Sequence, residues 1–514
     1  MKTPRPSSRR LAATLGALLL AAALAPALSA AVVLHPLFGD HAVIQSGDNV
    51  PVWGSADEGE KVTVRFAGQE ASAVTTQGRW EVRFNGLKAS PAAVELVATG
   101  KANTAKSTDV LVGEVWLCAG QSNMDFGVNG VLAADRDEAV AKSLPTLRFF
   151  NVAKVVSATP LTTTQGKWQL ASGKDVLACT AVGYYFGRSL QQTQPFPVGL
   201  IGSKWGGTLA EAWTRDEALK AQPSLASLFT RDQQAVAAYP KQLAEYPAAK
   251  AAYDQAVVAA KAAGQPLPKA PQEPADPATN KNRPSRLYNG MIHPLLPVAI
   301  RGILWYQGEG NQLRPLQYQT LLPAMIADWR KQWGRGDLPF YIVQIAPFNG
   351  MSAEIREAQM KISEKVPNAG IVCTLDVGEA TDIHPKNKRP VGERLARLAR
   401  SQVYGETVVS SGPRFAGLSV AGAVATVKLT HADGGLVANG GTLKGFAIAG
   451  ADQKFVEATA VIKGDTVEVT AAGVTAPVAV RYGWAGFPVT TLANGAGLPA
   501  FPFRSDEWKT AVTN

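Results

Sequence analysis

The sequence predicts an α/β protein in which a parallel sheet flanked by helices is bracketed by two β-domains. Three observations predict this class. Up to about Ser107, and again after about Glu406, apolar and polar residues alternate in short runs separated by turn residues, which is typical of antiparallel strands. Between these stretches, longer apolar runs alternate with helical patterns, which is typical of a parallel sheet. A chain of 514 residues is also too long for a single core.

Residues 1–30 have the pattern of a secretory signal peptide. A basic start precedes an apolar stretch from Leu11 to Leu24, and small residues follow up to Ala30. We therefore expect cleavage near Ala30 and a periplasmic or extracellular protein. The apolar stretch is short and rich in alanine, so no integral membrane segment is expected after cleavage. The pair Arg9 and Arg10 leaves Sec and twin-arginine export both open.

Residues 31–108 are expected to form an N-terminal β-sandwich, because residues alternate with period two between Gly and Asp turns. The expected strands are Val43–Gln45, Val50–Trp53, Lys61–Phe66, Trp80–Phe84 and Val94–Ala98.

Residues 109–405 are expected to form the catalytic α/β domain. Its clearest helix has an apolar stripe at helical spacing from Tyr318 to Trp329. The other expected elements are the strands Val110–Cys118, Phe340–Ile345 and Ile371–Leu375, with helices near Ile355–Val366 and Val391–Tyr404. Residues 216–285 interrupt this pattern with alanine-rich helical sequence and a proline-rich loop. They are expected to be an insertion, either a lid over the site or a solvated excursion.

Residues 406–514 return to period two and are expected to form a small C-terminal β-domain. The expected strands are Ala423–Leu429, Phe446–Ala449, Ala458–Ile462, Thr466–Thr470 and Val478–Tyr482.

Composition excludes several classes of function. The net charge is +10, but basic residues form no dense stripe with interleaved aromatics, which argues against nucleic-acid binding. No His or Cys residues recur at ligand spacing, so we expect no metal site. The three cysteines are an odd number for an exported protein, and we expect no essential disulfide. The oligomeric state is left open.

Ser122 is the first candidate catalytic residue. It lies in Gly-Gln-Ser-Asn-Met, directly after the apolar run that ends at Cys118. Open α/β sheets bind ligands just beyond the carboxyl ends of their strands. A serine there fits a nucleophile, although most loop serines only cap helices or close turns.

His384 is the candidate base, and Asp382 is the candidate acid that orients it. One of only five histidines, His384 follows Asp382 by two residues, in a loop after an expected strand. Serine, histidine and aspartate together perform acyl transfer. Asp376 and Glu379 are lesser candidates for the acid. Taken alone, His384 would read as a structural histidine.

Acyl transfer also needs donors for the oxyanion. The backbone amide of Ser122 and the tight turn at Gly206 and Gly207 are candidates, as are the side-chain amides of Gln307 and Asn311. The glycines fit an ordinary strand-to-helix turn equally well. Candidate substrate-binding residues are Gln121, Asn123, Trp205, Glu211 and Glu309.

Three other functions remain open at this point. A glycosidase would use two carboxylates such as Glu211 and Glu309, which would leave Ser122 and His384 without a role. A non-catalytic glycan-binding protein would not need the serine and histidine. A lipid or thioester hydrolase would need an apolar groove, whereas these loops are rich in Trp, Gln, Glu and Asn.

Four separated blocks resemble the SGNH hydrolases, specifically their sialate O-acetylesterase-like branch. The blocks are Gly113–Met124, Trp205–Trp213, Trp305–Asn311 and Asp382–Lys388, and Tyr288–Pro294 and Gly497–Phe503 are also similar to that branch. The resemblance covers about residues 32 to 508. It departs from the family at Gly310, where a serine or alanine is expected.

This resemblance implies a flavodoxin-like sheet with an N-terminal β-domain, and a cofactor-independent O-acetylesterase. Ser122 would be the nucleophile, His384 the base and Asp382 its partner. Oxyanion contacts would come from Ser122, Gly206, Gly207 and the Trp305–Asn311 loop. The partner would be an acetylated glycan, either a 9-O-acetylated sialic acid or a plant hemicellulose such as xylan or xyloglucan.

Overall fold

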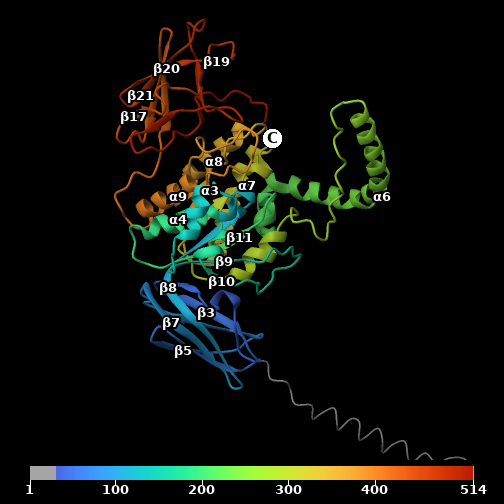
Figure 1. Cartoon of the computed structure of the whole chain (residues 1–514), viewed down its shortest axis with the longest axis vertical. Coiled ribbons are helices and arrows are strands. Elements are labelled where there is room, and N and C mark those ends of the chain that lie inside the picture. The colour runs from blue at the N-terminus through green and yellow to red at the C-terminus, as the bar shows by residue number, and fades with distance from the viewer. Residues whose placement is uncertain (1–30, 513–514) are drawn as a thin grey trace, which may run out of the picture.

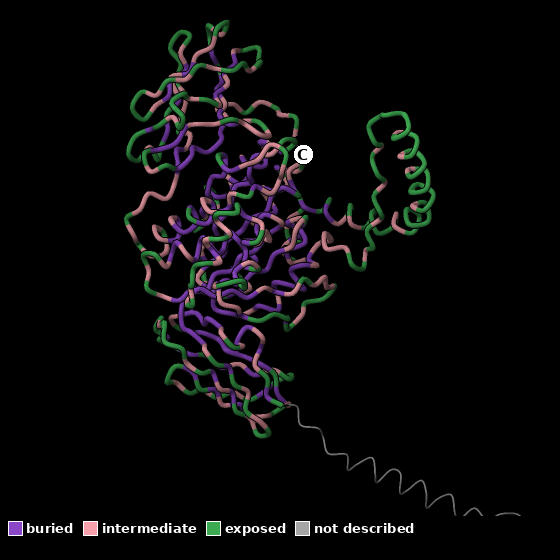
Figure 2. The backbone as a smooth tube through the Cα atoms, in the orientation of Figure 1, coloured by how far each residue is buried: buried purple, intermediate pink, exposed green. Residues whose placement is uncertain are grey.

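The computed structural model describes residues 31–512, so the predicted signal peptide lies outside the described residues. The molecule is elongated, with a β-region at each end and a layer of helices and strands between them (Figure 1). Buried residues concentrate in the central layer and continue into both β-regions (Figure 2). A long helical arm projects sideways from the central layer.

The N-terminal region consists of two packed sheets. Strands β1, β3 and β6 form one sheet, and β5, β4, β7 and β8 pair in that order in the other, with β2 on the far side of β8. Phe66 of β4 contacts Phe84 of β6, with ring centroids 5.9 Å apart, so the core lies between the sheets. The bounds are β1 Val33–Leu34, β2 Val43–Gln45, β3 Val50–Ser55, β4 Lys61–Phe66, β5 Gln69–Val74, β6 Arg79–Phe84, β7 Ser90–Thr99 and β8 Thr104–Gly120.

The central sheet continues from the far half of β8. Its order is β10-β9-β11-β8-β12-β13-β14, and all pairings except β10 with β9 are parallel. With β9 and β10 set aside, the remaining strands have the 2-1-3-4-5 order of flavodoxin-like sheets. The bounds are β9 Leu147–Asn151, β10 Trp168–Leu170, β11 Val198–Lys204, β12 Gly302–Tyr306, β13 Phe340–Val343 and β14 Ala369–Val372.

Helices cover both faces of this sheet, because its strands are apolar on both sides. Helix α4 (Ala181–Gln191) packs with α9 (Arg389–Gln402), and α7 (Pro315–Trp333) packs with α8 (Ala353–Lys365). Strand β12 separates the two cores. Leu304 and Tyr306 join the core that contains α4 and α9, whereas Ile303 and Trp305 join the core that contains α7 and α8.

Short helices occupy the remaining loops of the central layer. They include α2 Ser122–Asp125, α3 Ala133–Ala141, α5 Asp216–Lys220 and the single turns η5 Ala210–Trp213 and η9 Glu309–Asn311. Helix α6 (Ala226–Ala262) forms the projecting arm, and Leu228 is its only buried residue. Pro240 and Pro247 both lie within α6.

The C-terminal region is built from small antiparallel sheets around Phe446, Tyr482 and Phe503. Arg504 bonds Glu357 of α8 and so ties this region to the central layer. The bounds are β15 Arg414–Ala421, β16 Val424–Thr430, β17 Leu436–Ala438, β18 Phe446–Ala449, β19 Val456–Glu457, β20 Thr459–Lys463, β21 Thr466–Thr470, β22 Ala479–Tyr482, β23 Leu492–Asn494 and β24 Phe503–Arg504.

The α/β class and the individual strands and helices named from the sequence are confirmed within a few residues. The predicted boundary between residues 108 and 109 falls inside β8, because this one strand belongs to both sheets. Strand β5 was not expected from its small, polar residues. All three cysteines are buried free thiols. Among residues 31–512, no helix has both the length and the apolar character needed to cross a bilayer.

Candidate active site

Three strands end side by side at the candidate site. Gly120, the last residue of β8, pairs with Lys204 of β11 on one side and Tyr306 of β12 on the other. A Cβ atom at Gly120 would lie 2.2 Å from the carbonyl oxygen of Tyr306, and the φ angle of Gly120 is +140°. Only glycine fits this turn without strain. The loops after β8, β11 and β12 therefore meet where the strand order reverses direction, the position at which open α/β sheets bind ligands.

Ser122 begins α2 and is half-buried. Gln121, the residue before Ser122, is held by two hydrogen bonds. The amide of Gln121 donates to the carbonyl of Tyr306 at 3.0 Å, and the side chain of Gln121 accepts from the amide of Gly310 at 3.3 Å. These bonds hold the start of α2 against the Trp305–Asn311 loop.

Asn123 joins the serine loop to the histidine loop. Its side-chain amide donates to the carbonyl of Ile383 at 3.0 Å and to the Glu309 carboxylate at 2.7 Å. Ile383 directly precedes His384. The structure therefore brings the neighbours of the predicted nucleophile and base together, although Asn123 and Ile383 lie 260 positions apart in the sequence.

His384 and Asp382 lie next to each other in a partly exposed loop. Nδ1 of His384 is 3.6 Å from Oδ1 of Asp382, and the same oxygen accepts the backbone amide of His384 at 2.8 Å. The ring contact is longer than a hydrogen bond. Hydrogen bonds between catalytic groups are often long in structures without substrate, so this distance is compatible with the predicted pairing. The lesser candidates have other partners, since Asp376 bonds Arg394 and Glu379 accepts the amide of Lys386.

Lys388 is a residue of this site that the sequence analysis did not single out. It is fully buried, and its ammonium group donates to Oδ1 of Asn123. The ammonium nitrogen also lies 4.9 Å from the ring centroid of Phe126 and 5.6 Å from that of Tyr306. Burial lowers the pKa of Lys388 to about 7. The sequence signal that could have identified Lys388 is its position four residues after His384, within the Asp382–Lys388 block.

Glu309 completes this buried group. Burial raises the pKa of its carboxyl, and the hydrogen bond from Asn123 and the charges of Lys388 and His384 oppose that rise. Within the described residues, its second carboxylate oxygen has no hydrogen-bond partner. Asn123 thus lies between a lysine and a carboxylate, and one side chain bonds both.

Gly206 lies directly beside the serine. A Cβ atom on Gly206 would be 3.3 Å from the Cβ of Ser122, and Gly207 has a φ angle of +68°. The turn is held from outside by Lys281, whose ammonium group donates to the carbonyl of Gly206 at 2.5 Å, and by Asn282, which donates to the carbonyl of Gly207 at 3.1 Å.

Gln307 and Asn311 are buried among protein partners. The Gln307 amide donates to Oδ1 of Asn311 at 2.7 Å and to the carbonyl of Thr208 at 3.2 Å. The Asn311 amide donates to Glu211 at 2.8 Å. These side chains therefore stabilise the loop that carries the glycine turn, through the carbonyl of Thr208.

The five predicted substrate-binding residues occupy two kinds of environment. Trp205 is half-buried at the surface, and the Lys281 ammonium lies 5.4 Å from its ring centroid. The other four are buried and bonded to protein groups, namely Gln121, Asn123, Glu211 and Glu309. They shape the loops around the site.

Comparisons with known proteins point to one family. The model of the family described as "Carbohydrate esterase, sialic acid-specific acetylesterase" matches residues 277–401. Sialate O-acetylesterase from Rattus norvegicus is 30% identical over 400 residues, which cover 69% of this chain and 70% of the rat protein. This chain belongs to the sialate O-acetylesterase family. The human enzyme is 28% identical over 396 residues, covering 69% of this chain and 68% of the human protein.

A solved structure extends the similarity over almost the whole chain. The crystal structure of a carbohydrate acetylesterase from Xanthomonas citri aligns with a TM-score of 0.79 and 34% identity, over 93% of this chain and 100% of that one. Family membership makes this protein an esterase, a hydrolase that removes acetyl groups from sugars.

Proposed function

We propose that this protein is an exported carbohydrate O-acetylesterase that works through an acetyl-Ser122 intermediate. The observation that supports it best is the Asn123 bridge, which ties the loop of Ser122 to the loop of His384. Export rests on the sequence pattern of residues 1–30 alone.

In the first half of the reaction, His384 removes the proton of Ser122 as its oxygen attacks the acetyl carbonyl. His384 then protonates the departing sugar hydroxyl. In the second half, His384 deprotonates a water molecule that attacks the acetyl-serine, and acetate leaves. Asp382 orients the ring and stabilises the imidazolium.

The backbone amides of Ser122 and of the Gly206–Gly207 turn are the oxyanion donors in this proposal, since Gly206 lies beside the nucleophile. Gln307 and Asn311, predicted as alternative donors, act by bracing this turn, because their amides already have buried protein acceptors. Trp205 is the substrate-contacting residue among the five predicted.

The substrate is an acetylated glycan, and two classes remain in view. The sialate O-acetylesterase relatives favour an acetylated sialoside. The Xanthomonas enzyme matches more of this chain, at higher identity, and is known here only as a carbohydrate acetylesterase. Acetylated xylan and xyloglucan, which the sequence resemblance implies, are therefore the second candidate. Acetate release from acetylated sialosides, xylan and xyloglucan, measured side by side, decides between them.

Replacing Ser122 with alanine tests the mechanism. We expect turnover of p-nitrophenyl acetate to fall at least ~1000-fold, because the residual rate comes only from binding and oxyanion contacts. A fluorophosphonate should label the wild type at Ser122 and leave the variant unlabelled. Near-normal turnover by the variant would refute the assignment, and failure to label the wild type would favour a non-catalytic glycan-binding protein.

A further inference from the structure

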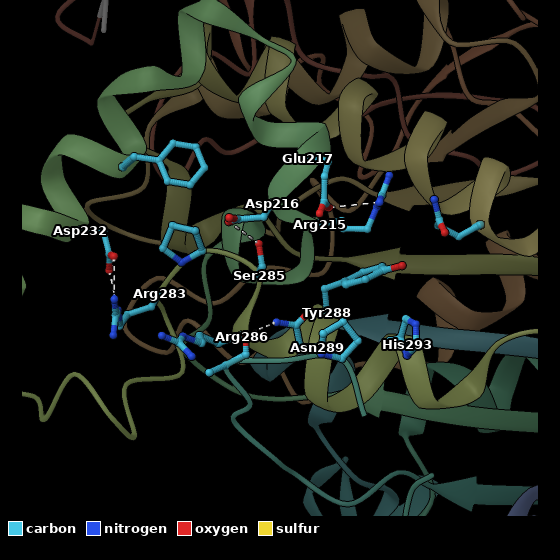
Figure 3. A pocket seen from close by; sticks show the side chains of 15 residues that line it. Arg215, Asp216, Glu217, Asp232, Arg283, Ser285, Arg286, Tyr288, Asn289 and His293 are labelled. Carbon is cyan, nitrogen blue, oxygen red and sulfur yellow. Dashed lines mark hydrogen bonds and ion pairs between the residues drawn. The ribbon is translucent and has the colours of Figure 1, made fainter. Parts of the chain in front are cut away.

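Lys388 differs from other charged side chains in what its charge contacts. In the cavity at the base of the helical arm, charges lie against opposite charges, with Arg283 next to Asp232 and Arg215 next to Glu217 (Figure 3). Lys388 is fully buried, and within residues 31–512 no carboxylate lies within ion-pair distance of its ammonium group. Proteins rarely bury a lysine unless it is paired with an acid. The burial of Lys388 therefore needs another explanation.

The hydrogen bond of Lys388 fixes the orientation of the Asn123 side chain. The ammonium group donates to Oδ1 of Asn123, and an ammonium group donates hydrogen bonds but accepts none. The two other neighbours of this side chain are acceptors, the Glu309 carboxylate and the carbonyl of Ile383. An amide turned by 180° would place its oxygen against both acceptors and its NH₂ group against the ammonium. Lys388 therefore selects the orientation in which Asn123 donates to Ile383.

This orientation matters because Asn123 connects two loops of the candidate site. Asn123 follows Ser122, and Ile383 precedes His384. In the described part of the chain, the 3.0 Å bond between them is the only hydrogen bond that joins residues 121–125 to residues 379–386. With the amide reversed, two oxygens would face each other and the loop of His384 would move away from Ser122. A misplacement of about 1 Å at reacting groups can lower a rate roughly 100-fold.

The surroundings of Lys388 hold its nitrogen in place. The nitrogen lies 4.9 Å from the ring centroid of Phe126 and 5.6 Å from that of Tyr306, and such contacts are favourable for a cation removed from water. Burial lowers the pKa of Lys388, and the charge of Glu309 opposes that shift. A neutral amine still carries N–H groups that donate to Asn123. The orientation of the amide is therefore kept in both protonation states of the lysine.

We propose that Lys388 is a positioning residue that acts through Asn123 and keeps the loop of His384 against the loop of Ser122. This proposal rests on the proposed roles of Ser122 and His384. Lys388 itself takes no part in the proton transfers and does not bind the glycan.

Two substitutions of similar size test this role. Lys388→Met removes the donor, and Lys388→Gln keeps an N–H donor without the charge. We expect Lys388→Met to lower kcat for p-nitrophenyl acetate roughly 100-fold and to leave KM within threefold, because it disturbs the reacting geometry and not the binding of substrate. Lys388→Gln should recover at least tenfold of this loss. The rate at which a fluorophosphonate labels Ser122 should fall in parallel with kcat.

Lys386→Met is the matched control, because it makes the same change at an exposed position in the same loop. Its kcat should stay within twofold of wild type. A near-normal kcat in Lys388→Met, with a native near-ultraviolet circular dichroism spectrum, would overturn the positioning role. So would an equal loss in Lys386→Met, because that lysine has no contact with Asn123.

A double-mutant cycle separates action through Asn123 from a general effect on the core. Asn123→Ala should lower kcat about as much as Lys388→Met does, and the double variant should fall no more than threefold below Asn123→Ala. If the two losses multiply, Lys388 acts independently of Asn123 and the proposal is wrong. Should Lys388→Met not fold, the cycle is made with Lys388→Gln, whose smaller loss should vanish in the Asn123→Ala background.

The esterase function is judged by separate measurements. A wild type that a fluorophosphonate does not label, or a fully active Ser122→Ala variant, contradicts that function whatever Lys388 does. A labelled wild type together with an unimpaired Lys388→Met variant contradicts the positioning role alone.

Discussion

At the scale of single residues, Gly206 is decisive because a side chain at this position would crowd Ser122, the proposed nucleophile. We expect Gly206→Ala to lower kcat roughly 100-fold, since the new methyl group meets the Cβ of Ser122 at 3.3 Å and shifts either the serine or the turn. The melting temperature should change little. Gly417→Ala is the control, because a Cβ there meets nothing within 4 Å. Turnover within twofold of wild type in Gly206→Ala would show that the turn lies outside the reacting groups.

Lys388 gives a second prediction, on the pH dependence of stability. Its pKa is about 7 when folded and near 10.5 when unfolded, so the unfolded chain binds more protons between these values. Stability from this residue therefore rises with pH through that window and is constant below it. Relative to Lys388→Met, the wild-type free energy of unfolding should gain roughly 2 kcal/mol between pH 7 and 9. Urea unfolding at both pH values measures this, and parallel pH profiles for the two proteins would contradict it.

The sequence analysis expected Ser122 and His384 at one edge of the sheet, and the bond from Asn123 to the carbonyl of Ile383 brings their loops together. The backbone pattern sufficed for this placement, because Ser122 follows β8 and its glycine turn and the loop of His384 follows β14. The catalytic roles of both residues stay a prediction. Lys388 was different. A lysine in a polar loop is expected to face water, whereas the rings of Phe126 and Tyr306, which come from other segments, lie against the ammonium group of Lys388. Burial of this kind is set by tertiary contacts and has no local pattern.

At the scale of elements, the arm formed by α6 is separate from the catalytic layer. Most of its outer part is exposed (Figure 2), and its ties to the body lie near its start, where Arg283 pairs with Asp232. The sequence predicted a helical insertion, and the structure adds that Pro240 and Pro247 do not end the helix. Proline costs helix stability without forbidding it, and α6 continues through both prolines. The choice between a lid and a solvated excursion stays a prediction.

Shortening this arm tests its independence. Replacing residues 237–272 with a flexible linker of about ten residues should leave p-nitrophenyl acetate turnover within threefold and change the melting temperature by only a few degrees, because Leu228, the buried residue of α6, is retained. If the arm contacts the glycan, turnover of glycan substrates should fall further than turnover of p-nitrophenyl acetate. Loss of the folded state would show that the arm contributes to the core.

At the scale of the whole molecule, β8 makes the N-terminal region and the catalytic sheet one structure. Its first half pairs with β7 and its second half with β11 and β12, while β2 pairs with its middle. Trp168 of β10, the edge strand of the central sheet, also donates to the carbonyl of Leu37 at 2.8 Å. A boundary within a strand cannot be read from periodicity, because the pattern changes at Val110 as burial becomes two-sided while the strand itself continues.

Cooperative unfolding should follow from this shared strand. We expect amide hydrogens of β4 and of β12 to lose protection at the same urea concentration, because melting either sheet exposes the apolar face and the unpaired edge of β8 that the other sheet needs. Hydrogen exchange followed by mass spectrometry, with peptides covering residues 61–66 and 302–306, measures this.

Deleting residues 31–103 should accordingly give an insoluble protein, because Leu111 and Val112 would lose the partners against which they are buried. Two separate transitions, or a soluble and active truncated enzyme, would show that the catalytic sheet holds β8 in place by itself.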